Sequence, residues 1–387
     1  MKIEQVYNLV NDVTAEVTGE SGLLTEDLSN VVQVGTTIQN IDGWQNRFVS
    51  ALLDRIGRMV FVDRPYAGSA PSILRESWEY GSIMMKVCSD LPEATENESW
   101  MLTDGASYDP FVYHENTADA KFYDHMVTFE IEKSIPNKQL KSAFTSATEL
   151  NAFVSMLFTQ VDNSMTVKND ALIMRVLNSM TADTFYNLHA GGTYTGKSGI
   201  RCVNLLYLYN QKFSQNLTAA AAITDAAFLR FASYHMGLYV KRLNKMSELF
   251  NIGGKKRFTP MDRMHIIYLD EFAQAAGSYL YDAANQFNSE NLKFPEAETV
   301  AFWQGSGTNY AFGNTSKINV VSGANHTVVA DGILGLMFDR DACAVCNENS
   351  RVETQYVAKG EFTNYFYRRD ARFFTDSNEN FVVFYVA

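Results

Sequence analysis

Apolar residues recur at every third or fourth position in several segments, which is the spacing of one helix face packed on a core. Such a stripe runs through 44–57, where every fourth residue from Trp44 to Ile56 is apolar and Gly57 closes the pattern. Another runs from about 225 to 250, and an alanine-rich stretch follows at 273–285. Each of the three predicts a helix of ordinary length.

A fourth stripe is much longer. Ser146 and Glu149 have the spacing of a capping box, which begins a helix. The apolar rhythm then continues over 150–180, and no Gly or Pro interrupts it before Gly191. At 1.5 Å per residue the pattern predicts a helix roughly 50 Å long. A helix of that length in a mixed protein serves as a spine for the rest of the fold.

Segments rich in β-branched and aromatic residues predict strands. They occur at 58–66, at 125–135, at 200–209 and at 264–272, the last one leading into the alanine-rich helix. The final sixty residues contain several more such segments, separated by turn residues, and predict an antiparallel sheet. Helices and strands are therefore mixed, and the predicted class is α+β.

The stretch between the strands at 58–66 and 125–135 is hard to bury. From Asp90 to Asp124 it holds nine acidic residues and one lysine, Lys121. So long an insert is uncommon inside a compact domain. We therefore predict a projecting two-stranded loop whose partners lie on another molecule, and a polar N-terminal arm over 1–43 with little core of its own.

Composition narrows the function. The chain has 387 residues, 46% hydrophobic content, 13% aromatic content and a net charge of −12. Aromatic residues are favoured at subunit interfaces, whereas an acidic chain is a poor candidate for tight, sequence-reading DNA binding. The compact basic cluster Lys255–Arg257 is expected to be a solvated turn. Neither a signal peptide nor an apolar run of about 18 residues is found, and four cysteines indicate a reducing cytosol.

One motif suggests nucleotide hydrolysis. Gly191, Gly196, Lys197 and Ser198 spell G-x-x-x-x-G-K-S, the loop that cradles phosphates when a buried strand delivers it and a helix follows it. Here the predicted order is reversed: helix, loop, strand. The apolar run before Asp270 resembles a magnesium-binding strand end, but a strand followed by a helix N-terminus, with Asp270 and Glu271 in its first turn, explains it better. The context argues against an ATPase.

Other chemical motifs are weaker. Cys343 and Cys346 have metal-knuckle spacing, but residues three apart on a strand point to opposite faces, so we expect buried packing. The six histidines are scattered, and the acidic residues of 90–124 lack the spacing of a calcium loop. The sequence therefore predicts no catalytic residue, no cofactor and no metal site, and hence no enzyme.

The layout of arm, helix, projecting loop, spine helix, inserted domain and terminal sheet resembles the Hong Kong 97-type major capsid proteins of tailed double-stranded DNA phages. Three segments (31–61, 140–165 and 336–387) are similar in order and spacing to the major head proteins of small short-tailed phages of the Salasvirus type. The middle of the chain, 190–325, is similar only in outline.

The resemblance implies a Hong Kong 97-like α+β fold with four parts. These are an N-terminal arm and helix (1–57), an extended loop of two long antiparallel strands (58–135), a peripheral domain holding the spine helix (136–190 and 325–387) and an inserted axial domain (191–324). The glycines around Lys197 would then serve the turn that leaves the spine helix.

The implied function is that of a major capsid protein. Copies would assemble, with a scaffolding protein and a portal, into hexamers and pentamers of an icosahedral or prolate shell. The shell would enclose DNA without sequence-specific binding, in the virion and, during assembly, in the host cytoplasm, with no membrane involved. We further predict that the acidic loop docks on basic residues of a neighbour. The expected intersubunit residues are Trp78, Tyr80, Glu93, Glu96, Glu98, Arg368, Arg369 and Arg372.

Two alternatives remain open at this point. A cellular nanocompartment shell of the encapsulin type would share the fold and enclose a cargo enzyme. A P-loop ATPase would need Lys197 to bind phosphate.

Overall fold

A computed structural model describes the chain between Ile3 and Ala387. The residues outside the description are 1–2, 20–23, 26–29, 41–46, 49–50, 52–68, 76–82, 90, 93, 95, 97–103, 106–110, 116–117, 137–146, 189–196, 281–296, 305–308 and 323–324. The strand predicted at 58–66 lies outside the described residues. Of the helix predicted at 44–57 only Arg47, Phe48 and Ala51 are described, and all three are helical.

The spine is helix α5, Ala147–Leu188. Its 42 residues give a length of about 63 Å, so the predicted long helix is confirmed and extends one to two turns beyond the predicted apolar stripe. Toward its C-terminal end the helix enters the main core, where Ile173 and Leu177 are fully buried. There Thr181 and Thr184 satisfy their hydroxyls by donating to backbone carbonyls four residues earlier.

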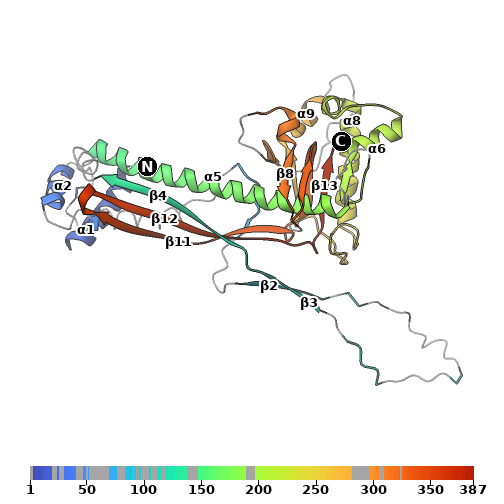
Figure 1. Cartoon of the computed structure of the whole chain (residues 1–387), viewed down its shortest axis with the longest axis horizontal. Coiled ribbons are helices and arrows are strands. Elements are labelled where there is room, and N and C mark those ends of the chain that lie inside the picture. Colours follow the sequence, from blue (N-terminus) through green and yellow to red (C-terminus); the bar gives the residue numbers. More distant parts are fainter. Residues whose placement is uncertain are drawn as a thin grey trace.

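A four-stranded sheet lies along α5 (Figure 1). Its strands, in spatial order, are β1 (Leu74–Arg75), β11 (Cys343–Val357), β12 (Phe362–Thr375) and β4 (Met126–Pro136). The long β11–β12 and β12–β4 pairs are antiparallel, and β1 joins in parallel. Over 362–368 of β12 the side chains of Thr363, Tyr365 and Tyr367 are buried, while the intervening positions, among them Arg368, are partly exposed on the other face of the sheet.

A five-stranded sheet lies at the C-terminal end of α5 (Figure 1). Its strands, in spatial order, are β5 (Cys202–Asn204), β13 (Phe381–Tyr385), β10 (Ile333–Asp339), β6 (Met264–Leu269) and β7 (Glu298–Val300). The β5–β13 and β6–β7 pairs are parallel, and the others are antiparallel. The single antiparallel sheet predicted for the last sixty residues is therefore wrong, because these strands divide between two sheets and one sheet is mixed.

Helices pack on this second sheet and complete the core. They are α6 (Leu205–Phe213), α7 (Ala219–Ala222), α8 (Ala226–Leu243), α9 (Asp270–Leu280) and α10 (Phe312–Thr315). The strand predicted at 264–272 is confirmed over 264–269, and α9 begins directly after it. The helix predicted at 273–285 is confirmed as far as Leu280, and 281–285 lie outside the described residues. A smaller hairpin is made by β8 (Ile318–Val321) and β9 (Thr327–Ala330), and a 3-10 turn, η3 (Ala358–Gly360), joins β11 to β12.

Two predicted boundaries are wrong, and local capping explains both. The strand predicted at 200–209 stops after three residues because the Asn204 side chain caps α6, accepting from the backbone N–H of Tyr207 at 3.0 Å. The helix predicted to reach residue 250 ends at Leu243, because the chain then turns back and pairs Ser247 with Arg257.

The N-terminal arm is more ordered than predicted. It contains α1 (Ile3–Thr18) and α2 (Val31–Asn40), which lie beside the N-terminal end of α5 (Figure 1). Val10 and Val13 of α1 are fully buried. The polar composition of 1–43 predicts little core. A segment that is polar in overall composition can still bury a narrow apolar stripe, and α1 does so.

A ribbon of two antiparallel strands, β2 (Met84–Ser89) and β3 (Ala118–Tyr123), extends from the body (Figure 1). The projecting two-stranded feature predicted for this region is thus present in the described residues. The returning strand at 125–135 is also confirmed as β4, which pairs with β12 in the body. None of the described helices combines the length and hydropathy that a membrane span requires.

Candidate assembly surfaces

The inner face of the ribbon is fixed to the body of its own subunit. Met84 and Tyr123 stand opposite each other in the ribbon and pack against Ala344 and Phe374. The rings of Tyr123 and Phe374 lie 5.1 Å apart. This small apolar cluster anchors the base of the ribbon.

Beside that cluster, charged groups form a second attachment, here called the latch. Lys86 Nζ lies 2.6 Å from a carboxylate oxygen of Asp376 and 2.6 Å from one of Glu379, and Lys121 Nζ lies 3.0 Å from Asp376. The Asp376 side chain is completely buried. Farther along the ribbon, Lys255 of the body meets Asp119 at 2.5 Å. Two buried acids thus receive the cations of the ribbon.

The pKa values of the latch follow from burial and charge together. Burial alone would raise the pKa of Asp376, but hydrogen bonds from Lys86 and the Asn378 backbone, with the nearby lysine charges, lower it below its ordinary value. Burial dominates at Glu379 and raises its pKa. At Lys86 burial acts to lower the pKa, and the two acids outweigh it and raise the pKa.

The outer face of the ribbon is apolar and open. Ile83, Met85, Val87 and Phe122 are between 54% and 64% exposed. Met85 stands directly opposite Phe122, so these side chains form one continuous stripe. Contiguous exposed apolar side chains of this kind are typical of surfaces that bind a partner.

The outer part of the extended loop combines aromatic and acidic side chains. Phe111 is 91% exposed and Tyr113 is 86% exposed. The predicted contact residue Glu96 is exposed there, as are Asp104 and Glu115. Four other predicted contact residues lie outside the described residues, namely Trp78, Tyr80, Glu93 and Glu98.

The three predicted arginines all lie on β12. Arg368 pairs with Glu130 of β4 and, at 2.8 Å, with Glu353 of β11. Its hydrogen bond lowers the pKa of Glu130. Arg372 is paired with Glu348. These two guanidinium groups therefore already have carboxylate partners within their own subunit.

Arg369 points to the opposite side of the sheet, because neighbouring residues of a strand alternate between faces. Burial lowers its pKa, and the charge of Asp162 on α5 opposes that shift. Arg369 thus lies on the side of the sheet that faces the spine helix, whereas Arg368 lies on the opposite side. An intersubunit role for the three arginines stays a prediction.

The described part of the phosphate-loop motif serves a backbone turn. Helix α5 precedes it and β5 follows it, so the predicted order of helix, loop and strand is confirmed. The Lys197 carbonyl accepts from the Tyr385 hydroxyl at 3.1 Å, and Ser198 Oγ accepts from the Asn204 backbone at 3.1 Å. Residues 189–196 lie outside the description. Asp270 and Glu271 occupy the first turn of α9.

The two cysteines of the CAVC segment are buried on β11. Burial raises the pKa of Cys343 to about 12, which keeps the thiol protonated at neutral pH. Their spacing on a continuous strand places them on opposite faces. Among the described residues, no group of three or more His, Cys, Asp or Glu side chains is arranged to hold a metal ion.

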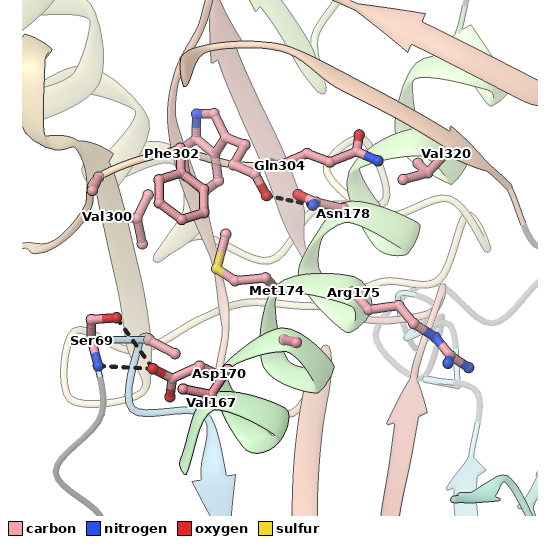
Figure 2. A pocket seen from close by; sticks show the side chains of 14 residues that line it. Ser69, Val167, Asp170, Met174, Arg175, Asn178, Val300, Phe302, Gln304 and Val320 are labelled. Atoms are coloured by element: carbon pink, nitrogen blue, oxygen red, sulfur yellow. Dashed lines mark hydrogen bonds between the residues drawn. The ribbon is translucent and has the colours of Figure 1, made fainter. Parts of the chain in front are cut away.

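A cavity of about 500 Å³ lies beside the middle of α5 (Figure 2). Apolar side chains such as Met174 and Phe302 form much of its wall. Asp170 accepts from the Ser69 backbone at 3.1 Å, and Asn178 donates to the Trp303 carbonyl at 2.6 Å. These bonds tie α5 to the segment before β1 and to the segment after β7.

Comparison with known proteins identifies the family. The sequence matches the family of Phi29-like phage major capsid proteins over residues 9–385. It is 25% identical over 175 residues to the major capsid protein of Bacillus phage GA-1, a match that covers 43% of this chain and 34% of that protein. The chain thus matches about a third of the length of this curated relative.

Solved capsid structures are similar in outline. The capsid structure of Staphylococcus phage Andhra shares 10% identity over 84% of this chain and 86% of that chain, with a TM-score of 0.49. The capsid structure of Cyanophage P-SCSP1u shares 10% identity over 84% and 93%, with a TM-score of 0.45. Because the family match extends over nearly the whole sequence, the chain belongs to the Phi29-like phage major capsid protein family.

Proposed function

We propose that copies of this chain assemble into hexamers and pentamers of a phage head shell that encloses double-stranded DNA. The family match supports this proposal, and the match is to phage capsid proteins, which favours a phage head over a cellular compartment. No enzymatic step is part of the proposal.

The observation that carries the proposal is the two-faced ribbon. Its inner face is held against the body by buried ion pairs and by the Tyr123 cluster, so the orientation of the ribbon relative to the body is fixed. Its outer stripe of Met85, Val87 and Phe122 is left in solvent. A monomer gains nothing from exposing such a stripe, whereas a shell of identical copies can bury it against a neighbour.

We propose for the shell protein the same division into parts that the resemblance implies. In this proposal 58–135 reaches over a neighbouring subunit. Residues 136–190 with 325–387 form the peripheral domain, and 191–324 form the axial domain at the centre of each hexamer or pentamer. A scaffolding protein and a portal assist assembly in the host cytoplasm. The shell holds DNA without reading its sequence, as the net charge of −12 favours.

The ribbon surface can be tested with a double substitution, Val87→Lys with Phe122→Lys. Both side chains are exposed, so the monomer should keep its melting temperature, while burial against a neighbour would force two charges into an apolar contact. We expect the yield of particles in a sucrose gradient to fall at least tenfold. The matched control, Val87→Ala with Phe122→Leu, keeps the stripe apolar and should retain most of the yield.

Wild-type yields from the lysine variant would remove the ribbon from the interface. A lower melting temperature of its monomer would show that the stripe supports the fold of the subunit instead.

A further inference from the structure

A row of cations lies on the solvent side of helices α6 and α8. Arg230, Tyr234 and Lys241 follow the spacing i, i+4 and i+11, which places them within about 40° of one another around α8. Lys245 follows the end of that helix, and Lys212 of α6 lies 6.0 Å from the Tyr234 ring. Tyr234 is itself exposed. We call Lys212, Arg230, Tyr234, Lys241 and Lys245 the basic face.

Within the described residues, the cations of the basic face have no carboxylate paired with them. Elsewhere in the described part of the chain, basic residues such as Arg75, Lys86 and Arg368 pair with carboxylates of their own subunit. None of the four cations of the basic face forms an ion pair with a described carboxylate. Beneath them, burial and the charges of Lys212 and Arg242 lower the pKa of His235, as a positive field requires.

The charge is also concentrated along the sequence. Residues 201–263 hold ten Lys and Arg against three Asp and Glu, inside a chain of net charge −12. A positive region within an acidic protein steers an acidic partner to one place.

The same chain carries a matching set of unpaired anions. Glu96, Asp104 and Glu115 of the extended loop are exposed, and none is paired within the described residues. Within a subunit the described ribbon meets a different basic residue, because Asp119 pairs with Lys255, which lies outside the basic face.

We propose that the basic face of one copy receives the carboxylates of the extended loop of a neighbouring copy. This inference rests on the proposed shell function and names the receiving surface within it. It also gives the acidic loop a receiver other than Arg368 and Arg372, which have partners in their own subunit. Each subunit supplies one loop and one basic face. In a closed assembly every loop can therefore bind the basic face of a neighbour.

The contact can be measured by zero-length cross-linking of wild-type protein. A carbodiimide joins a carboxylate to a lysine amine only when the two touch. Equal amounts of ¹⁴N- and ¹⁵N-labelled protein are assembled together and cross-linked, and the peptides are identified by mass spectrometry. We expect mixed-isotope links between a loop carboxylate, such as Glu115, and Lys212, Lys241 or Lys245. Particles whose mixed-isotope links all lie elsewhere would overturn the proposal.

A charge exchange tests the same contact by function. Arg230→Glu with Lys241→Glu, or Glu96→Lys with Glu115→Lys, should each reduce particle yield at least tenfold. Combining the four substitutions should restore at least half of the wild-type yield. The control pair, Lys168→Glu with Lys359→Glu, makes the same charge change on exposed positions outside the basic face and should assemble normally.

Unchanged yields from either reversal, or no recovery in the fourfold variant, would contradict the pairing. If wild-type protein forms no particles, the shell function itself fails, and the cross-links in any smaller oligomer still decide the pairing. Binding of linear double-stranded DNA to the wild type and to the Arg230/Lys241 variant tests the rival explanation, that the basic face binds nucleic acid. Tight binding that is lost in the Arg230/Lys241 variant while particle yield is unchanged would assign the basic face to nucleic acid.

Discussion

At the scale of single residues, Asp376 shows how one face of the ribbon is held against the body of its own subunit. It lies in the turn between β12 and β13, is completely buried, and accepts from Lys86, Lys121 and the backbone of Asn378. A buried carboxylate without such partners would be costly. The turn therefore fixes both lysines, and with them one face of the ribbon.

Replacing Lys86 with Met tests the latch. The change removes one cation from Asp376 and Glu379, and Lys121 still faces Asp376. We expect a loss of about 1–3 kcal/mol in the free energy of unfolding, less than for an acid left wholly unpaired. Hydrogen exchange over 84–89 and 118–123 should accelerate with it. Lys359→Met, at an exposed position, is the control, and equal effects of the two changes would count against the latch.

The latch also predicts a pH dependence. Asp376 has a lowered pKa, so its contribution to stability is present above the unfolded value of about 3.9 and is lost as the pH falls through the lower folded value. Urea titrations between pH 2 and pH 6 should therefore show a shallower pH dependence in Asp376→Asn than in wild type. Identical slopes would mean that Asp376 carries no linked stability.

The contacts of the phosphate-loop residues predict that the chain does not bind Mg-ATP. Lys197 and Ser198 engage the backbone turn between α5 and β5, through the Lys197 carbonyl and the Ser198 hydroxyl. Mg-ATP should leave the melting temperature unchanged, in wild type and in Lys197→Ala alike. If Mg-ATP raised the melting temperature of the wild type and not that of Lys197→Ala, the nucleotide-binding hypothesis would be supported again.

At the scale of elements, helix α5 has two environments. Near residues 163–168 it is open to solvent on one side, and Val167 is 65% exposed. From Leu172 onward it passes between the two sheets and the packed helices, where Leu177 and Phe185 are fully buried. One helix thus forms both an exposed spine and a wall of the core, which holds the two sheets in a fixed relation.

Truncation within α5 separates these environments. Leu177→Ala should lower the free energy of unfolding by about 2–5 kcal/mol, because it leaves a cavity in close-packed surroundings. Val167→Ala on the exposed stretch should change it by about 0.5 kcal/mol or less. Chemical denaturation of both variants gives the comparison, and similar losses at the two positions would contradict the division.

At the scale of the whole molecule, the sequence predicted the parts with strong local signals. The long apolar rhythm of α5 and the buried run of β6 with the acidic first turn of α9 needed only neighbouring residues. The α+β class expected from the sequence is confirmed by the observed helices and sheets, and the expected phage capsid family is confirmed by the family match. The acidic excess of 90–124 predicted a projecting segment, and its described residues Glu96, Asp104 and Glu115 are exposed, while much of the segment lies outside the description.

Other features depended on distant contacts that spacing cannot show. Strands β10 to β13 are continuous in sequence but divide between two sheets, because β4 and β6 pair with different members of the set. Arg368 looked available until the fold placed Glu130 beside it from 238 residues away. The basic face also needed the contact between Lys212 of α6 and the Tyr234 ring of α8, which the spacing along α8 alone does not show.

The most direct test of the account is negative-stain imaging of the purified full chain, expressed alone and together with a candidate scaffolding protein. The account predicts closed shells, tubes or hexameric rings in at least one preparation. A well-behaved monomer in both preparations would contradict shell assembly, whatever the ribbon and the basic face contribute.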